Sequence, residues 1–195
     1  MSTNEDAVLI VSGLPRSGTS MMMRMLEFGG LPVLIDEIRT PNEDNPNGYY
    51  EFEAVKQTRQ DASWLGNAAG KVVKMVYRLL YDLPRGYDYK VIFMRRNTDE
   101  VLASQKKMLE RNGDARINDI SSAQISALFR RQLKEFKEWI EGQSNFSILE
   151  VDYNRTLEEP EAELERLNAF LGGRLDTRAM VEVVDQTLYR NRVAR

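Results

Sequence analysis

The stretch that most constrains this chain is residues 13–20, Gly-Leu-Pro-Arg-Ser-Gly-Thr-Ser, which separates two apolar segments. Residues 7–11 read Ala-Val-Leu-Ile-Val, which is typical of a strand buried on both faces of a parallel sheet. Residues 21–28 are apolar at nearly every position and long enough for a helix. Unpaired N–H groups at the start of that helix point into a loop whose glycines let a ligand approach the backbone closely. The loop is therefore predicted to bind an anion, most often a phosphate.

Strand and helix patterns alternate along the remaining chain. Further strands are expected at residues 32–35, 71–76, 89–94 and 146–151. Helices are expected at residues 54–64, from 97 or 98 to before Gly113, at 123–140, from Pro160 to about 171, and at 177–185. This alternation predicts an α/β protein, a three-layer P-loop-type fold with a mainly parallel central sheet and helices on both faces. Ligands of such sheets bind at the carboxyl ends of the strands.

The length, net charge and residue composition of the chain limit the kinds of site and reaction that it can have. The 195 residues suit one domain, with a flexible N-terminus at 1–6 and a basic tail at 187–195. A net charge of −3 does not favour nucleic-acid binding, and no apolar run reaches the length of a membrane span, so a cytoplasmic location is expected. The chain has no cysteine and no histidine, so a thiolate metal site and a histidine base are excluded. A proton acceptor must be a carboxylate, a lysine or a tyrosine.

The loop departs from the nucleotide-binding pattern G-x-x-x-x-G-K-[ST], because Thr19 stands where that pattern has lysine. The cation of the loop is Arg16 instead. Hydrolysis of ATP or GTP uses the lysine on the β- and γ-phosphates, so the sequence argues against it. A glycine turn that merely joins a strand to a helix is the alternative interpretation.

A second anion-binding pattern follows the strand at 89–94. Arg96 stands at the end of this strand, where its guanidinium can chelate a phosphate with two hydrogen bonds. Ser104 lies eight residues later, on the helix face turned toward the sheet, and can donate to the same anion. Arg95 competes with Arg96 for this role, and a surface arginine beside an ordinary helix serine is the alternative.

Both patterns, in this order, resemble those of sulfotransferases that use 3′-phosphoadenosine 5′-phosphosulfate (PAPS). P-R-S-G-T-[ST] is similar to their 5′-phosphosulfate loop, and Arg96 with Ser104 is similar to their 3′-phosphate motif. Residues 45–51 resemble the N-P-x-G-[YF]-[YF]-E stretch of bacterial sulfotransferase-like proteins, and residues 146–172 resemble a later family segment more weakly, with Asn154 in the place of an acidic residue. The resemblance covers about residues 7–172 and is closer to the tyrosylprotein branch, which uses a carboxylate base, than to the cytosolic branch, which uses a histidine.

The resemblance implies metal-free transfer of a sulfuryl group from PAPS to a hydroxyl or amine, leaving adenosine 3′,5′-bisphosphate (PAP). Arg16 would stabilise the transferring group, with Glu37 as general base and Glu51 as the second candidate base. Either glutamate is otherwise a solvated loop charge. Lys74 loosely matches a catalytic lysine of the tyrosylprotein branch and could equally be an edge-strand charge.

The remaining site residues follow from the same resemblance. The acceptor, a small molecule, carbohydrate or peptide, would contact Arg39, Tyr49 and Tyr50. The residues expected to bind the nucleotide are Pro15, Arg16, Ser17, Gly18, Thr19, Ser20, Arg96, Ser104, Tyr153 and Arg190. The alternative function is a P-loop nucleotide-binding or kinase-like protein without sulfuryl transfer, for which Asp152 is the candidate magnesium ligand.

Overall fold

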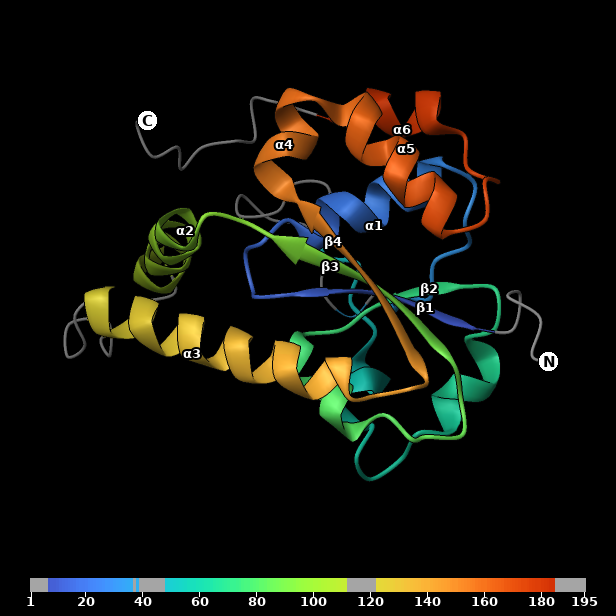
Figure 1. Ribbon diagram of the computed structural model, residues 1–195, viewed down its shortest axis with the longest axis horizontal. Coiled ribbons are helices and arrows are strands. Elements are labelled where there is room, and N and C mark those ends of the chain that lie inside the picture. The colour runs from blue at the N-terminus through green and yellow to red at the C-terminus, as the bar shows by residue number, and fades with distance from the viewer. Residues whose placement is uncertain (1–6, 37, 39–47, 112–121, 185–195) are drawn as a thin grey trace.

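The computed structural model describes residues 7–36, 38, 48–111 and 122–184, and a four-stranded parallel sheet lies at their centre. The strands are β1 (Val8–Gly13), β2 (Val72–Lys74), β3 (Tyr89–Arg95) and β4 (Phe146–Asp152), in the spatial order β2-β1-β3-β4 (Figure 1). Because every pairing is parallel, the carboxyl ends of the strands meet at one edge of the sheet. The phosphate-type loop follows β1, one of the two central strands.

Hydrophobicity explains which strands are central. β1 and β3 are apolar at nearly every position and almost fully buried, as strands covered on both faces must be. β4 lies at one edge and exposes about half of its residues, and β2 at the other edge has only three residues. The register places Val11 between Lys74 of β2 and Ile92 of β3, so the end of β2 reaches the level at which the loop begins.

One face of the sheet is covered by α1 (Thr19–Phe28), α4 (Tyr153–Glu158), α5 (Pro160–Phe170) and α6 (Thr177–Glu182) (Figure 1). Methionines of α1 pack into this core with residues of the sheet and of α5 and α6. The principal buried residues here are Val11, Met22, Met23, Met25, Leu26, Ile92, Leu164, Leu167 and Met180.

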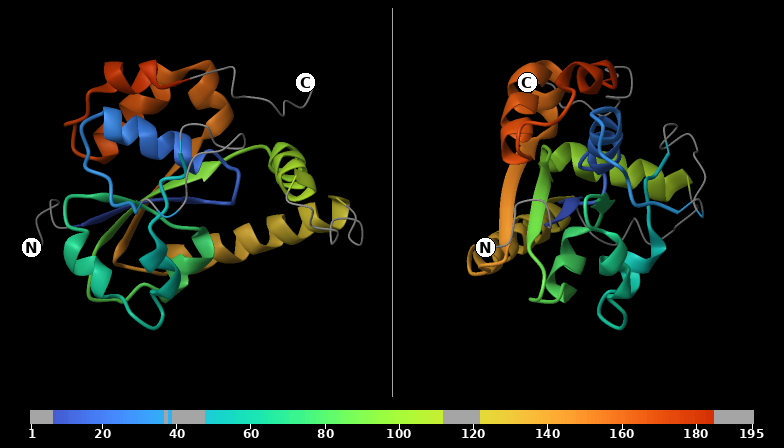
Figure 2. Two further views of the ribbon diagram at one scale, coloured as in Figure 1. Left: turned by 180° about the vertical axis from the view of Figure 1, so that it is seen from behind. Right: turned by 90° about the vertical axis from the view of Figure 1, so that its right-hand side faces the viewer.

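The opposite face is covered by α3 (Ser122–Glu141) and by three 3₁₀ helices, η1 (Glu53–Gln57), η2 (Ser63–Asn67) and η3 (Tyr77–Asp82) (Figure 2). Phe136 of α3 stacks on Phe93 of β3 with ring centroids 5.0 Å apart. The remaining helix, α2 (Thr98–Arg111), begins directly after β3 at the carboxyl edge of the sheet. The predicted fold class, an α/β protein with a parallel sheet and helices on both faces, is confirmed.

Several expected elements differ in detail. The strand expected at 32–35 is a single bridge between Val33 and Val72, and Val72 is the first residue of the three-residue edge strand β2. The helix expected at 54–64 is instead the pair η1 and η2. Between them, the Asp61 carboxylate accepts a hydrogen bond from the Ser63 N–H, and such local bonds compete with a continuous helix.

The C-terminal part holds a helix that the sequence did not predict. Helix α4 begins at Tyr153, where the Asp152 side chain caps it by accepting from the Arg155 N–H. Helix α5 begins at Pro160 as expected, and α6 ends at Glu182 rather than 185. The predictions for residues 1–6 and 187–195 lie outside the described residues. Within the part of the chain that the structure describes, no helix is both long and apolar enough to cross a membrane.

Candidate functional site

The loop between β1 and α1 adopts a backbone that requires glycine. Gly18, which caps the start of α1, has a φ of 97°. A Cβ atom at Gly18 would lie 2.3 Å from the Tyr153 ring, and one at Gly13 would lie 2.6 Å from the Ser17 Oγ. The loop is therefore packed closely against the Ser17 hydroxyl and against Tyr153 at the start of α4, and these contacts fix its shape.

The start of α1 presents polar groups at this loop. Thr19 and Ser20 open the helix, whose capping residue provides no side-chain hydrogen bond to the first-turn N–H groups. The Ser12 and Ser17 hydroxyls are buried and have no hydrogen-bond partner among the described residues. A helix N-terminus with unsatisfied donors attracts an anion, so these features fit a phosphate or sulfate group. Pro15 lies exposed on the outer side of the loop.

Arg16 connects the loop to α2. Its backbone has a φ of 71°, and its Nε donates to the Ser104 Oγ at 2.9 Å, although the two residues are 88 positions apart. Ser104 is 3% exposed, so this contact with Arg16 lies in the interior of the protein. The cation of the first pattern and the hydroxyl of the second pattern are thus in direct contact.

Arg96 lies under the same loop. Its side chain is only 8% exposed, and its Nη1 donates to the Arg16 carbonyl oxygen at 3.2 Å. Arg95 points elsewhere, because its Nη1 pairs with Glu150 on the exposed side of β4 at 3.1 Å. The structure therefore brings Arg96 to the loop and leaves Arg95 at the surface.

The Tyr153 ring packs against both Arg96 and the loop. The Arg96 guanidinium carbon lies 4.5 Å from the centroid of the Tyr153 ring, close enough for a cation–π contact. The same ring occupies the space that a side chain at position 18 would need. Burial raises the pKa of Tyr153 above its ordinary value, although the nearby Arg96 works against the rise. Tyr153 therefore stays neutral and serves as a packing surface for Arg96.

Lys74 approaches the loop from the other side. Its side chain is 14% exposed, and its Nζ lies 3.3 Å from the Ser20 Oγ at the start of α1. The same ammonium donates to the Tyr49 carbonyl oxygen, which also accepts from the Ser20 hydroxyl at 3.2 Å. Lys74 is thus both a residue of an edge strand and a neighbour of the loop.

Of the two candidate bases, Glu51 lies within the described residues and Glu37 lies outside them. The Glu51 Oε1 lies 3.9 Å from the Lys74 Nζ, and its side chain is 24% exposed. The Asp36 N–H donates to the Glu51 carbonyl oxygen at 2.9 Å, so the backbone next to Glu37 pairs with the Glu51 segment. A carboxylate is therefore placed beside Lys74 and Ser20, at the carboxyl edge of the sheet.

The proposed acceptor residues differ in placement. Tyr49 is buried beside Lys74 and Ser20. The Tyr50 hydroxyl donates to Glu27 at 2.6 Å, in the last turn of α1 and away from the loop. Burial and this hydrogen bond raise the pKa of Tyr50 well above its ordinary value. Arg39 and Arg190 lie outside the described residues, so their predicted roles stay predictions.

Two residues of the cluster were missed in the sequence. Glu100, 3% exposed, accepts from the Arg96 Nε at 3.0 Å, and Asn154 Nδ2 donates to the same Glu100 oxygen at 3.1 Å. The four-residue spacing from Arg96 to Glu100 is the usual spacing of a helical ion pair and was the available signal. No local signal linked Asn154 to Glu100, because the two residues are 54 positions apart.

The kinase-like alternative depended on Asp152. Its carboxylate is occupied as the cap of α4, where it accepts from the Arg155 N–H at 3.0 Å. Among the residues that the structure describes, no three acidic side chains converge in a group suited to a metal ion. Asp152 therefore has a structural role that explains its position at the end of β4.

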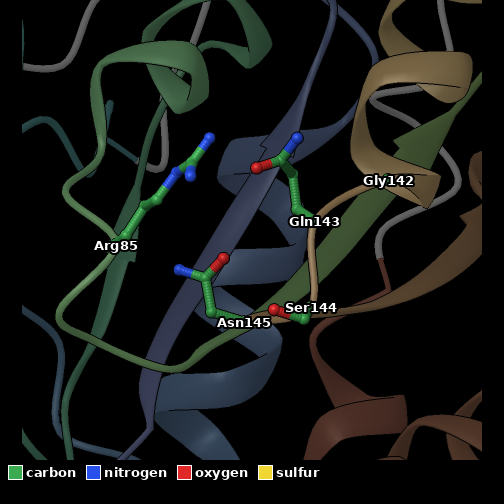
Figure 3. Close-up of a pocket in the computed structure, with 5 residues that line it drawn as sticks. All are labelled: Arg85, Gly142, Gln143, Ser144 and Asn145. Atoms are coloured by element: carbon green, nitrogen blue, oxygen red, sulfur yellow. The ribbon is translucent and has the colours of Figure 1, made fainter.

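A shallow pocket of about 160 Å³ lies at the opposite, amino-terminal edge of the sheet (Figure 3). Figure 3 shows the Arg85, Gln143 and Asn145 side chains directed toward a shared space. The two amides are used in holding the chain, because Gln143 donates to the Trp139 carbonyl oxygen and Asn145 to that of Tyr87. This pocket is separate from the loop and holds none of the predicted site residues.

Comparison with known proteins identifies relatives of this arrangement. A model of the sulfotransferase family matches residues 46–177, about two thirds of the chain. No curated protein sequence matches the chain.

Solved structures of sulfotransferases share the fold at low sequence identity. A mouse sulfotransferase, SULT7A1, in complex with PAP superposes with a TM-score of 0.61 at 15% identity, over 99% of this chain and 69% of the mouse protein. The sulfotransferase domain of the curacin biosynthetic pathway gives a TM-score of 0.55 at 15% identity, over 92% of this chain and 78% of that domain. The corresponding domain of the olefin synthase of Synechococcus PCC 7002 gives 0.54 at 15% identity, over 97% and 81%.

Proposed function

The chain belongs to the sulfotransferase family, and from this premise we propose that it transfers a sulfuryl group from PAPS to a hydroxyl or amine of an acceptor. The observation that carries the proposal is the convergence of Arg16, Arg96 and Ser104 at the loop after β1. Two arginines and a hydroxyl, from segments far apart in the sequence, there surround a helix N-terminus whose N–H groups favour anions. The SULT7A1 structure, which holds PAP, supports the choice of nucleotide.

The loop fits the phosphosulfate end of this nucleotide. Glycine at position 18 lets the loop turn against the Tyr153 ring into the start of α1, and the buried Ser17 hydroxyl lies at the same turn without a partner in the described part of the chain. Arg16 extends from this turn with a part-buried guanidinium. These groups would bind the 5′-phosphate and the sulfuryl oxygens, on which negative charge is concentrated.

The reaction breaks the bond between sulfur and the bridging oxygen, and the electron pair stays on the 5′-phosphate of PAP. A bond forms between sulfur and the acceptor atom, whose proton passes to a base. Arg16 and the N–H groups of α1 would stabilise the charge that develops on the leaving phosphate, and Lys74 beside Ser20 adds a second cation. Cations placed before the reaction in a part-buried site stabilise this charge better than water does.

The proton acceptor is assigned to a carboxylate, as the resemblance to the tyrosylprotein branch implies for a chain that has no histidine. Glu37 is the first candidate and Glu51 the second. Glu51 is supported by its position beside Lys74, at 3.9 Å between Oε1 and Nζ. Glu37 is supported by its neighbour Asp36, whose backbone bonds to that of Glu51. For Glu51, this position is at the edge of the sheet where the sulfuryl group would lie.

Arg96 and Ser104 are assigned to the 3′-phosphate, so binding should depend on that group. Calorimetric titration with PAP and with AMP tests this. We expect PAP to bind more tightly, and Arg96→Ala to weaken PAP binding by about 2–4 kcal/mol, the range for truncating a charged contact of this kind. Arg95→Ala is the matched control, because Arg95 contacts Glu150 at the surface and should leave the affinity unchanged.

Two results would contradict the proposal. Equal affinities for PAP and AMP would show that the 3′-phosphate is not recognised. Tighter binding of ADP than of PAP would favour the kinase-like alternative. Transfer of labelled sulfate from PAPS to a panel of phenolic, carbohydrate and peptide acceptors then identifies the acceptor class.

A further inference from the structure

Glu100 is a buried carboxylate for which the proposed reaction has no direct use. It lies in the first turn of α2, and its side chain is 3% exposed. One of its oxygens, Oε2, accepts from the Arg96 Nε at 3.0 Å and from the Asn154 Nδ2 at 3.1 Å. Glu100 therefore contacts the arginine that is assigned to the 3′-phosphate. As a carboxylate, it is not itself a group that would bind a phosphate.

A gain in folding stability is a weak explanation for the buried ion pair between Arg96 and Glu100. Removing two charges from water costs several kcal/mol each, and replacing a buried ion pair with apolar residues is often neutral or stabilising. The ion pair has a larger effect on the orientation of the Arg96 side chain, because a guanidinium is a planar group whose N–H bonds point in set directions. An arginine that must present two parallel hydrogen bonds to a phosphate needs its plane held.

Several contacts hold the plane of the Arg96 guanidinium. Glu100 accepts from its Nε edge, the Arg16 carbonyl oxygen accepts from Nη1, and the Tyr153 ring lies against its face at 4.5 Å. Asn154 in turn holds Glu100, and its Oδ1 accepts from the Asn97 N–H at 3.4 Å. The start of α4 and the turn before α2 are thereby joined around one cation.

We propose that Glu100 is a positioning residue that sets the selectivity of the site for nucleotides with a 3′-phosphate. The proposal rests on the proposed function, because it assumes that Arg96 contacts this phosphate. Glu100 contributes nothing to affinity by its charge, since a carboxylate beside Arg96 weakens the attraction for an anion. Its contribution is the alignment of the guanidinium, which only a ligand with a 3′-phosphate uses.

Two substitutions separate alignment from charge. These two contacts end on the same Glu100 oxygen, and the amide oxygen of Glu100→Gln can accept from the Arg96 Nε and the Asn154 Nδ2 in the same way. Glu100→Ala removes the acceptor altogether. Glu150→Ala is the matched control, because it removes the exposed carboxylate that pairs with the neighbouring Arg95.

The experiment measures the ratio of the dissociation constants for AMP and PAP by calorimetry. We expect Glu100→Ala to lower this ratio about tenfold or more, as loss of an aligned charged contact does. Glu150→Ala should keep the ratio of the unchanged protein, and Glu100→Gln should keep or raise it, because the acceptor oxygen stays while the opposing charge is removed. A ratio that Glu100→Ala leaves intact, or that Glu100→Gln lowers as much as Glu100→Ala does, would overturn the proposal.

Asn154→Ala keeps the test open if Glu100→Ala does not fold, because Asn154 is only half-buried and holds Glu100 from the other side. A smaller fall in the ratio is expected, and an unchanged ratio counts against the proposal. Failure of the proposed function gives a different result, since the unchanged protein would then bind AMP and PAP equally.

Discussion

Replacing Gly18 with alanine tests whether the close packing of the loop determines its shape. Gly18 has a φ of 97°, and a Cβ atom there would lie 2.3 Å from the Tyr153 ring. Gly30, in the turn after α1, has the same φ of 97° but has no atom within 4 Å of the place where a Cβ would lie. The two glycines share the backbone strain and differ in the steric contact.

The magnitude follows from these two contributions. A left-handed backbone costs an L-residue about 1–2 kcal/mol, so Gly30→Ala should lower the free energy of unfolding by that amount. Gly18→Ala adds an overlap with a buried ring, and forcing extra atoms into a packed site costs about 1–3 kcal/mol more. The loss of freedom in the unfolded chain is the same for both variants and cancels in the comparison.

Urea denaturation of both variants, followed by tryptophan fluorescence, measures the difference. Calorimetry with PAP should show weaker binding for Gly18→Ala, because the ring that moves also supports Arg96. In a Tyr153→Ala background the extra cost of Gly18→Ala should disappear, which a double-mutant cycle detects. Equal losses of stability for Gly18→Ala and Gly30→Ala would refute the reasoning.

Three further predictions concern catalysis and pH. Arg16→Ala should lower kcat more than it weakens PAP binding, since its contact grows as charge develops, and an unchanged kcat with a raised KM would make Arg16 a ground-state anchor only. Glu37→Gln should keep PAP binding and lower kcat about a hundredfold or more, with a milder effect of Glu51→Gln, and the reverse order in steady-state assays would assign the base to Glu51. Burial raises the pKa of Tyr89 and Tyr153, so the folded state keeps protons that the unfolded state loses. Their contribution to stability should therefore be complete below about pH 10 and fall as pH rises further, and urea denaturation of Tyr89→Phe should show a shallower fall.

The sequence alone determined the fold class and the place of the loop that we propose as the anion site. The apolar run 7–11, the glycine loop and the apolar run 21–28 are local patterns, and β1, the loop and α1 form where these patterns lie. The strand before Arg96 and the helix that carries Ser104 were predictable for the same reason. Weaker patterns predicted less well, as the divided helix at 54–64 shows.

Contacts between distant segments were decided only by the tertiary structure. The sequence left Arg95 and Arg96 as alternatives, and the structure separates them because adjacent side chains leave β3 in different directions, one to Glu150 and the other to the loop. It also left Lys74 open between an edge charge and a site residue, and the parallel register of β2 with β1 brings it to the loop.

The bond from Asn154 to Glu100 illustrates the physical reason. Each residue is an ordinary polar side chain in its own segment, and the local sequence around one does not predict a contact with the other. They meet because β4 pairs with β3, so that the start of α4 lies against the first turn of α2. The order of the strands depends on how much apolar surface the whole sheet buries. A short stretch of sequence does not contain this information.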